Sequence, residues 1–95
     1  MRPETVLVRN AGLSAAPIDR ELVMLNPASD HYISLDEIGR AVWELLEHPL
    51  PVDELCRRLS QRFDATPERI ATDLLPFLSE LSAEGIISVV DNRIS

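Results

Sequence analysis

The side chains best suited to chemistry are few and lie far apart in this sequence of 95 residues. The only histidines, His31 and His48, have no cysteine or second histidine at metal-ligand spacing, so we expect no metal ion and no cofactor. The single cysteine, Cys56, falls on the apolar face of a predicted helix, where a thiol behaves as a small buried hydrophobe. Because no nucleophile-elbow, phosphate-loop or dinucleotide-binding pattern occurs, we predict no catalytic residues and no enzyme.

Charge and cysteine content narrow the class of partner. The chain has 9 basic and 16 acidic residues and a formal net charge of −7. Nucleic-acid affinity comes mostly from Lys and Arg, so we expect neither nucleic acid nor a membrane surface as a partner, but basic peptides or basic protein faces. One cysteine allows no intrachain disulfide, and no apolar run resembles a signal peptide or a membrane span. We therefore expect a soluble, cytoplasmic protein.

Two motifs keep other binding functions open. Arg57, Arg58 and Arg62 form a local basic patch that suits either a DNA-recognition helix or a solvated helix face, and the acidic net charge favours the solvated face. Ser34-Leu35 at a predicted helix start resembles the attachment site of small acidic carrier proteins, but Ile33 stands where their aspartate would be.

The first third of the chain reads as strands and connections. Thr5–Arg9, Glu21–Leu25 and His31–Leu35 are rich in apolar and β-branched residues and predict three strands. Asn10–Arg20, with Gly, Ser, Ala and Pro, reads as a connection. Asn26–Asp30 is dense in turn formers and predicts a hairpin between the last two strands.

Three helices follow. The first is expected to begin near Glu37, capped either by Ser34 in a capping box or by Asp36, and to end at His48-Pro49. The second spans about Val52–Phe63.

The third helix carries the clearest boundary signals. Thr66 is a good N-cap before Pro67, and Gly85 is a good C-cap glycine before a final strand at Ile86–Val90. Pro76 lies inside this helix and predicts a bend, which either curves the helix over the core or shapes a ligand groove. Residues 1–95 thus predict a single α+β domain like a winged helix-turn-helix, with a three-stranded antiparallel sheet, three helices and a short C-terminal strand.

The spacing of HYISLDEIGRAVWELL, VDELCRRLSQRFD and ERIATDLLPFLSELSAEGII resembles the PqqD-like family, the RiPP recognition elements of ribosomal peptide natural-product pathways. A free-standing chain of this length with a Tyr and a Trp in this region looks most like the leader-binding proteins of lasso-peptide pathways. Asp36 stands where the family most often has Asn, and it remains a good cap. The resemblance covers about residues 21–90 and is carried by Tyr32, Leu35, Gly39, Trp43, Leu46, Leu55, Leu59, Phe63, Asp73, Phe77, Leu78, Leu81, Gly85 and Ile86.

The resemblance implies a non-catalytic adaptor. A precursor's leader peptide would add as a fourth strand to the free edge of the third strand, and the adaptor would deliver it to a leader peptidase and a cyclase. On the third helix, Asp73 and Glu80 would attract a basic leader residue, while Leu74 and Phe77 also look like core. The alternatives are a PqqD-type peptide chaperone of quinone-cofactor synthesis and an acidic winged-helix DNA-binding protein. The implied peptide site consists of His31, Tyr32, Ile33, Ser34, Leu35, Asp73, Leu74, Pro76, Phe77 and Glu80.

Overall fold

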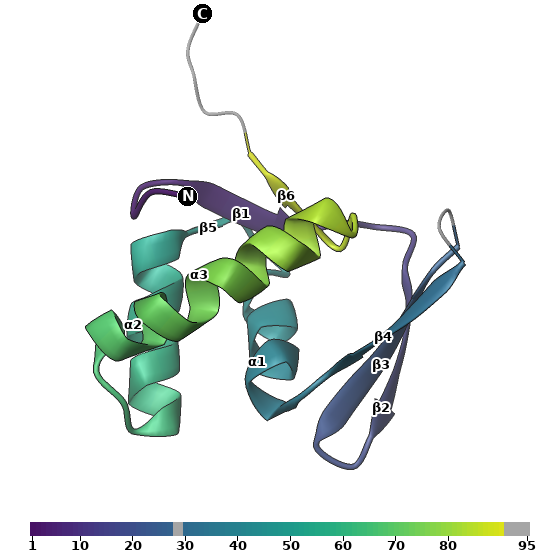
Figure 1. Ribbon diagram of the computed structural model, residues 1–95, viewed down its shortest axis with the longest axis horizontal. Helices are drawn as coiled ribbons and strands as arrows, with labels where there is room; N and C mark the ends of the chain where they lie inside the picture. The colour runs from purple at the N-terminus through teal and green to yellow at the C-terminus, as the bar shows by residue number, and fades with distance from the viewer. Residues whose placement is uncertain (28–29, 91–95) are drawn as a thin grey trace, which may run out of the picture.

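The computed structural model describes residues 1–27 and 30–90. It has the predicted winged-helix order and the predicted α+β class (Figure 1). Within those two ranges, no helix is long and apolar enough to cross a membrane. The elements are β1 (Val6–Arg9), β2 (Ser14–Ile18), β3 (Glu21–Asn26), β4 (His31–Leu35), α1 (Glu37–Leu45), β5 (Leu50–Pro51), α2 (Val52–Phe63), α3 (Pro67–Ala83) and β6 (Ile87–Val89).

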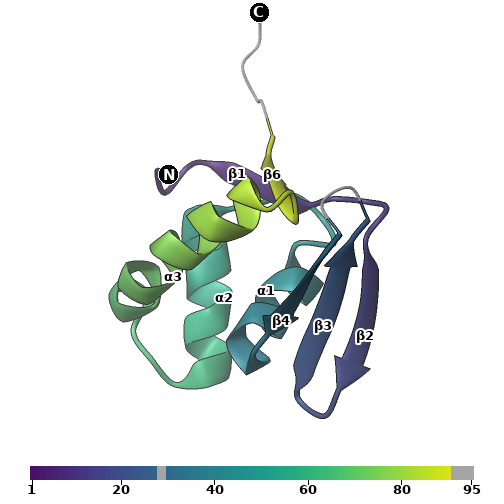
Figure 2. The same cartoon turned by 45° about the vertical axis from the view of Figure 1, so that its right-hand side comes forward.

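The strands form two separate antiparallel sheets. One has the order β5-β1-β6 and the other β2-β3-β4. The helices lie on one side of the β2-β3-β4 sheet, and α1 packs against β3 and β4 (Figures 1 and 2). This sheet, which we call the wing, therefore has one face toward the helices and its two edges at β2 and β4.

Two strands, β2 and the two-residue β5, were not expected. Asn10–Arg20 was predicted as a connection, but Ser14–Ile18 forms β2 and pairs along its whole length with β3. The three-stranded sheet therefore contains β2 in place of β1. The sequence signal for β2 is weak, because all five of its residues are exposed and it contains Pro17, which is tolerated only on an edge strand. The turn residue Asp19 adopts φ 56 without the glycine that marks most such hairpins.

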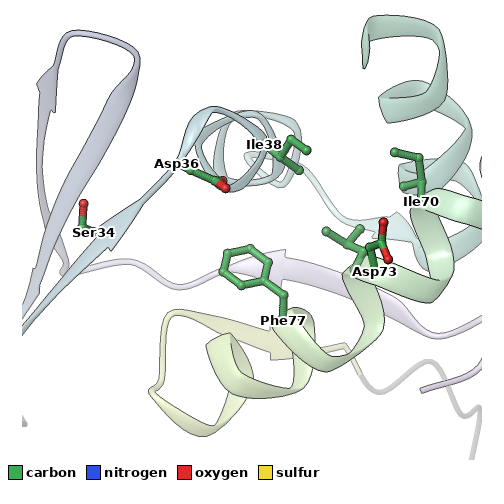
Figure 3. Close-up of a pocket in the computed structure, with 7 residues that line it drawn as sticks. Ser34, Asp36, Ile38, Ile70, Asp73 and Phe77 are labelled. Atoms are coloured by element: carbon green, nitrogen blue, oxygen red, sulfur yellow. The ribbon is translucent and has the colours of Figure 1, made fainter. Parts of the chain in front are cut away.

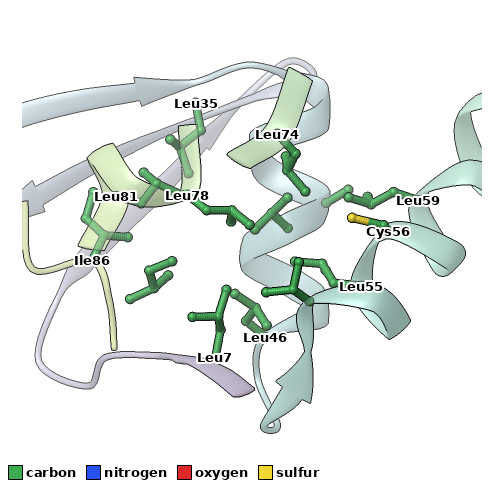
Figure 4. Close-up of a cluster of buried hydrophobic side chains, with 14 of the residues drawn as sticks. Leu7, Leu35, Leu46, Leu55, Cys56, Leu59, Leu74, Leu78, Leu81 and Ile86 are labelled. Carbon is green, nitrogen blue, oxygen red and sulfur yellow. The ribbon is translucent and has the colours of Figure 1, made fainter. Parts of the chain in front are cut away.

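The core is built almost entirely from aliphatic side chains of both sheets and all three helices (Figure 4). Cys56 is among them at 3% exposure, as the apolar stripe of α2 predicted. The sheet contributes Leu22, Met24 and Leu35 from one face, and β1 contributes Leu7. This shared core fixes the wing against the helices.

Asp36, rather than Ser34, caps α1. The Asp36 carboxylate accepts a hydrogen bond from the Gly39 amide at 2.8 Å, whereas the Ser34 hydroxyl donates to Glu21 at 3.1 Å. The helix ends at Leu45, three residues before the predicted His48-Pro49. The earlier end frees the following residues to turn, so that Leu50 and Pro51 pair with β1.

The other helix boundaries agree with the sequence prediction. The hydroxyl of Thr66 accepts a hydrogen bond from the Arg69 amide at 3.2 Å, and Gly85 follows α3 with φ 77. α3 continues through Pro76, which is exposed. An exposed position lets water hydrate the Thr72 carbonyl that loses its amide partner there. The bend itself stays a prediction.

Gly39 brings α1 and α3 into close approach. A Cβ atom at this position would lie 3.0 Å from Cζ of Phe77 and 3.1 Å from Cβ of Leu35. The Phe77 ring tip could move, but Leu35 is a core residue whose Cβ moves only with β4. Gly39 therefore sets how closely the Phe77 ring approaches the first turn of α1.

The two capping hypotheses predict different stabilities. Asp36→Ala should lower the free energy of unfolding by about 1 kcal/mol, because an orphan amide of α1 loses its acceptor. Ser34→Ala removes only an exposed hydrogen bond and should cost much less. Urea denaturation followed by circular dichroism measures both, and a larger loss for Ser34→Ala would reinstate the capping box.

For Gly39→Ala, helix propensity and crowding predict changes of opposite sign in the free energy of unfolding. Helix propensity alone predicts a gain of about 1 kcal/mol from Gly to Ala. Crowding against Leu35 and Phe77 predicts a loss of about 1–2 kcal/mol, as in other overpacked sites. We expect the loss in a urea titration. A gain in stability would mean that Leu35 and Phe77 move aside at little cost.

Candidate functional site

β4 has an unpaired edge beside the helices. Over residues 1–27 and 30–90, this strand pairs with β3 alone, in a register that joins Leu22 to Leu35 and Leu25 to Tyr32. The final strand β6 pairs with β1 and so leaves the edge of β4 uncovered. An open edge presents a row of amide and carbonyl groups that can pair with another chain.

α3 runs past β4 in the opposite direction. At the start of β4, Nδ1 of His31 lies 3.8 Å from a carboxylate oxygen of Glu84 beyond the end of α3. Past the end of β4, the Phe77 ring approaches Gly39 of α1. The exposed edge of β4 thus runs alongside α3 between these two contacts (Figure 2).

A pocket of about 370 Å³ lies where β4 ends, α1 begins and α3 passes. Figure 3 shows the Phe77 ring between α1 and α3, with Ile38 and Ile70 on opposite sides of the opening. The hydroxyl of Ser34 points away from the ring. The pocket is lined by Ser34, Asp36, Ile38, Ile70, Asp73, Leu74 and Phe77, and we call it the α1–α3 pocket.

A second hollow adjoins the α1–α3 pocket and extends it toward the α2–α3 connection. It has a volume of about 440 Å³ and shares Ile38, Ile70 and Asp73 with the first. Its further lining comes from residues 63–66 and from Arg69. Together the two hollows extend from the end of β4 to the first turn of α3.

The charge at the pocket mouth is partly compensated. A carboxylate oxygen of Asp73 lies 3.7 Å from Nε of Arg69, one turn earlier on α3. Both side chains are more than 70% exposed, so water and salt screen this pair and it holds neither group firmly. Asp36 is committed to the α1 cap. Apart from Ser34, the remaining lining residues are apolar, and a wall of this kind favours contact with an apolar side chain.

The predicted site residues fall into three groups. Ser34, Asp73, Leu74 and Phe77 come together around the pocket, although Leu74 is 3% exposed and belongs mainly to the core. Ile33 is half-buried and Leu35 is buried beneath the β4 edge, while His31 contacts Glu84 at its far end. Tyr32, Pro76 and Glu80 are exposed and lie outside the pocket lining.

Sequence reasoning missed Asp36, Ile38 and Ile70 as pocket residues. Helical periodicity alone puts Ile38 and Ile70 on the apolar faces of α1 and α3, which suggests that both belong to the core. Ile70 is indeed 7% exposed, but Ile38 is 36% exposed and opens on the pocket. Helical periodicity finds such residues without separating those that fill the core from those that line a cavity beside it.

The structure also bears on the two other kinds of chemistry considered from the sequence, a nucleophilic Cys56 and a metal site. Burial raises the pKa of the Cys56 thiol, with a further contribution from Asp53, and this disfavours the thiolate needed for nucleophilic attack. The part of the chain with described coordinates contains no group of three His, Cys, Asp or Glu side chains placed to hold a metal ion.

The basic patch of α2 is paired with carboxylates. Arg57 and Arg58 both bind Glu54, and the Arg58 hydrogen bond is the main reason why the pKa of Glu54 falls below its usual value. Arg62 lies 3.5 Å from a carboxylate oxygen of Glu44. These pairs compensate part of the basic charge of α2.

Known proteins resemble this chain in both sequence and fold. The PqqA binding protein of Rhizobium meliloti (strain 1021) is 29% identical over 84 residues, which are 88% of this chain and 84% of that protein. TbiB1, solved in complex with the TbiA(beta) leader peptide, superposes with a TM-score of 0.74 at 23% identity, covering 93% of this chain and 99% of TbiB1.

A second solved structure is the PqqD truncation of Methylobacterium extorquens PqqCD, described as a functional and stand-alone RiPP recognition element. It superposes with a TM-score of 0.71 at 26% identity, covering 87% of this chain and 88% of that one. The family model for coenzyme PQQ synthesis protein D (PqqD) matches residues 21–87, from β3 to the start of β6. Because that match takes in β4, all three helices and the pocket between them, the chain belongs to the PqqD family.

Proposed function

We propose that this chain is a non-catalytic recognition domain that binds the leader segment of a ribosomally made precursor peptide. The observation that carries the proposal is the open edge of β4 beside the apolar α1–α3 pocket. An extended peptide satisfies the edge by adding a strand, and its backbone hydrogen bonds supply affinity without regard to sequence. The peptide site comprises the backbone of His31–Leu35 and the facing side of α3 from Asp73 to Glu80.

The pocket supplies the selective part of this interaction. Ile38, Ile70 and Phe77 form an apolar wall just beyond the end of β4. A leader side chain that enters the pocket loses its contact with water, which stabilises the complex by about 1.5–3 kcal/mol for a fully buried aliphatic or aromatic group. Asp73 adds attraction for a basic residue nearby, though its pairing with Arg69 reduces that effect.

The family and its named members support peptide binding. The relative from Rhizobium meliloti is named for binding PqqA, and the Methylobacterium extorquens domain is described as a RiPP recognition element. The class of natural product made from the precursor is a further part of the proposal. We propose a lasso-peptide pathway, in which the domain delivers the leader to a separate leader peptidase and cyclase. The 29% identity to the PqqA binding protein favours the alternative, a PqqA chaperone of quinone-cofactor synthesis.

Fluorescence anisotropy with labelled peptides tests binding and separates these two classes. The peptides are the leader of a precursor encoded beside this chain, the TbiA(beta) leader and PqqA. Tight binding of the first peptide supports our proposal, provided that the precursor it comes from carries a lasso-type core. Preference for PqqA would establish the alternative, and no binding to any of the three would overturn peptide recognition.

Exposed isoleucines allow a matched test of the pocket. Ile38→Asp should weaken peptide binding at least tenfold, because a carboxylate replaces apolar surface in the α1–α3 pocket. The fold should tolerate this change, since an acidic residue is favourable in the first turn of a helix. Ile18→Asp is the control, because Ile18 is 55% exposed on the distant strand β2. Equal weakening by both variants would remove the pocket from the site.

Strand addition predicts a two-residue period along the peptide. A bound strand directs alternate amides toward β4, so N-methylation of every second leader residue should weaken binding about tenfold or more. N-methylation of the residues between them should have much smaller effects. Isothermal titration calorimetry with a set of singly N-methylated leaders measures this pattern. Uniform tolerance of N-methylation would show that the peptide binds without joining the sheet.

A further inference from the structure

We propose that the outer face of β4 also reads the peptide, through Tyr32, which pairs across the sheet edge with an apolar leader side chain. This inference rests on the proposed strand addition and concerns the outer face of β4, away from the apolar wall of Ile38, Ile70 and Phe77. It assigns a specificity role to an exposed side chain rather than to the backbone edge or the pocket.

The two faces of β4 follow from strand alternation. Leu35 is buried and Ile33 half-buried, so the odd-numbered residues of β4 face the core side. Tyr32 and Ser34 therefore face outward, which agrees with the Ser34 hydrogen bond to Glu21 on β3. The helices lie on the core side of the sheet (Figures 1 and 2). No helix of the described residues lies on the outer face.

Tyr32 occupies an incomplete row on this face. Its partner on β3 is Leu25, and Leu25 is paired in turn with Ser14 on β2. A side chain within a sheet has a lateral neighbour on each side, but Tyr32 has one on the β3 side only and is 74% exposed. An added strand would place one residue directly opposite Tyr32 and complete the row.

The chemistry of the row sets the class of residue that fits. Leu25 is half-buried and Tyr32 offers an aromatic ring, so an apolar or aromatic leader residue gains most from pairing there. The next outward position lies opposite Ser34, whose hydroxyl already donates to a carboxylate. That position suits a polar or small residue. Single exposed aromatics are ordinary on protein surfaces, and it is the place of Tyr32 on an open edge that distinguishes it.

Affinity measurements test whether the Tyr32 side chain contributes to the free energy of leader binding. Tyr32→Ala should weaken binding of the leader identified above by about three- to tenfold, the range expected for an aromatic cross-strand pair. Ile18→Ala is the control, since Ile18 is exposed on the same outer face but lies two strands from the edge. It should change affinity less than twofold. Unchanged affinity in Tyr32→Ala would overturn the inference while leaving strand addition intact.

Disulfide trapping tests the geometry. Directly opposite residues in neighbouring strands lie within the Cα separation that a disulfide requires, whereas residues two positions away lie beyond it. Tyr32→Cys and Ser34→Cys proteins are mixed with leader peptides that carry one cysteine each, in a glutathione redox buffer. The native thiol of Cys56 is buried and its pKa is raised, so it should not compete.

The expected pattern is one preferred leader position for each variant, two residues apart. A preferred position for Ser34→Cys that precedes the one for Tyr32→Cys indicates an antiparallel guest strand, and the reverse order indicates a parallel one. Peptide that binds by anisotropy but cross-links to neither cysteine would overturn the outer-face inference and the strand addition on which it rests, while leaving peptide binding intact. Peptide that fails to bind the unmodified protein would overturn both this inference and the proposed function.

Discussion

The unpaired backbone of β4 is the constraint on which the rest of the site depends. Amide and carbonyl groups that are buried without a hydrogen-bond partner are costly, so a strand edge must be covered, hydrated or completed. In residues 1–27 and 30–90 the edge is left open beside α3, because β4 leads through Asp36 directly into α1 and the later strand β6 pairs with β1 instead. The Phe77 ring meets α1 at Gly39, beyond the end of the strand. α3 therefore stands along the edge as a wall without contributing a strand to it.

The apolar pocket beside this edge explains why the chain exposes Ile38. An isoleucine that is 36% exposed in the first turn of a helix contributes less to the core than its buried neighbours do. Its side chain, with Ile70 and Phe77, instead forms a surface that a guest residue can cover. The ionic groups at the mouth are exposed and mutually paired, so they can orient a peptide but add little affinity.

Sequence patterns located the elements whose signals are local. α2 has the predicted bounds, and β4 was placed correctly because a turn-forming segment precedes it and a cap follows. β2 escaped detection because Ser, Ala and Pro have low strand propensity, and its place in the sheet comes from pairing with β3. The pocket could be predicted only in part. Phe77 was expected there, but the role of Ile38 depends on the separation of α1 and α3, which no local pattern encodes.

The two modes of recognition at β4 respond differently to sequence change. Backbone pairing requires only that an edge be open and its surroundings rigid, conditions that Gly39, Leu35 and the α1 cap maintain. Side-chain pairing depends on which residues occupy the pocket wall and the outer row, and these can vary without disturbing the core. Under the proposed function, chains that share this fold could therefore keep strand addition while selecting different leaders. For this chain, selectivity would then reside in Ile38, Ile70 and Phe77 on one face of β4 and in Tyr32 on the other.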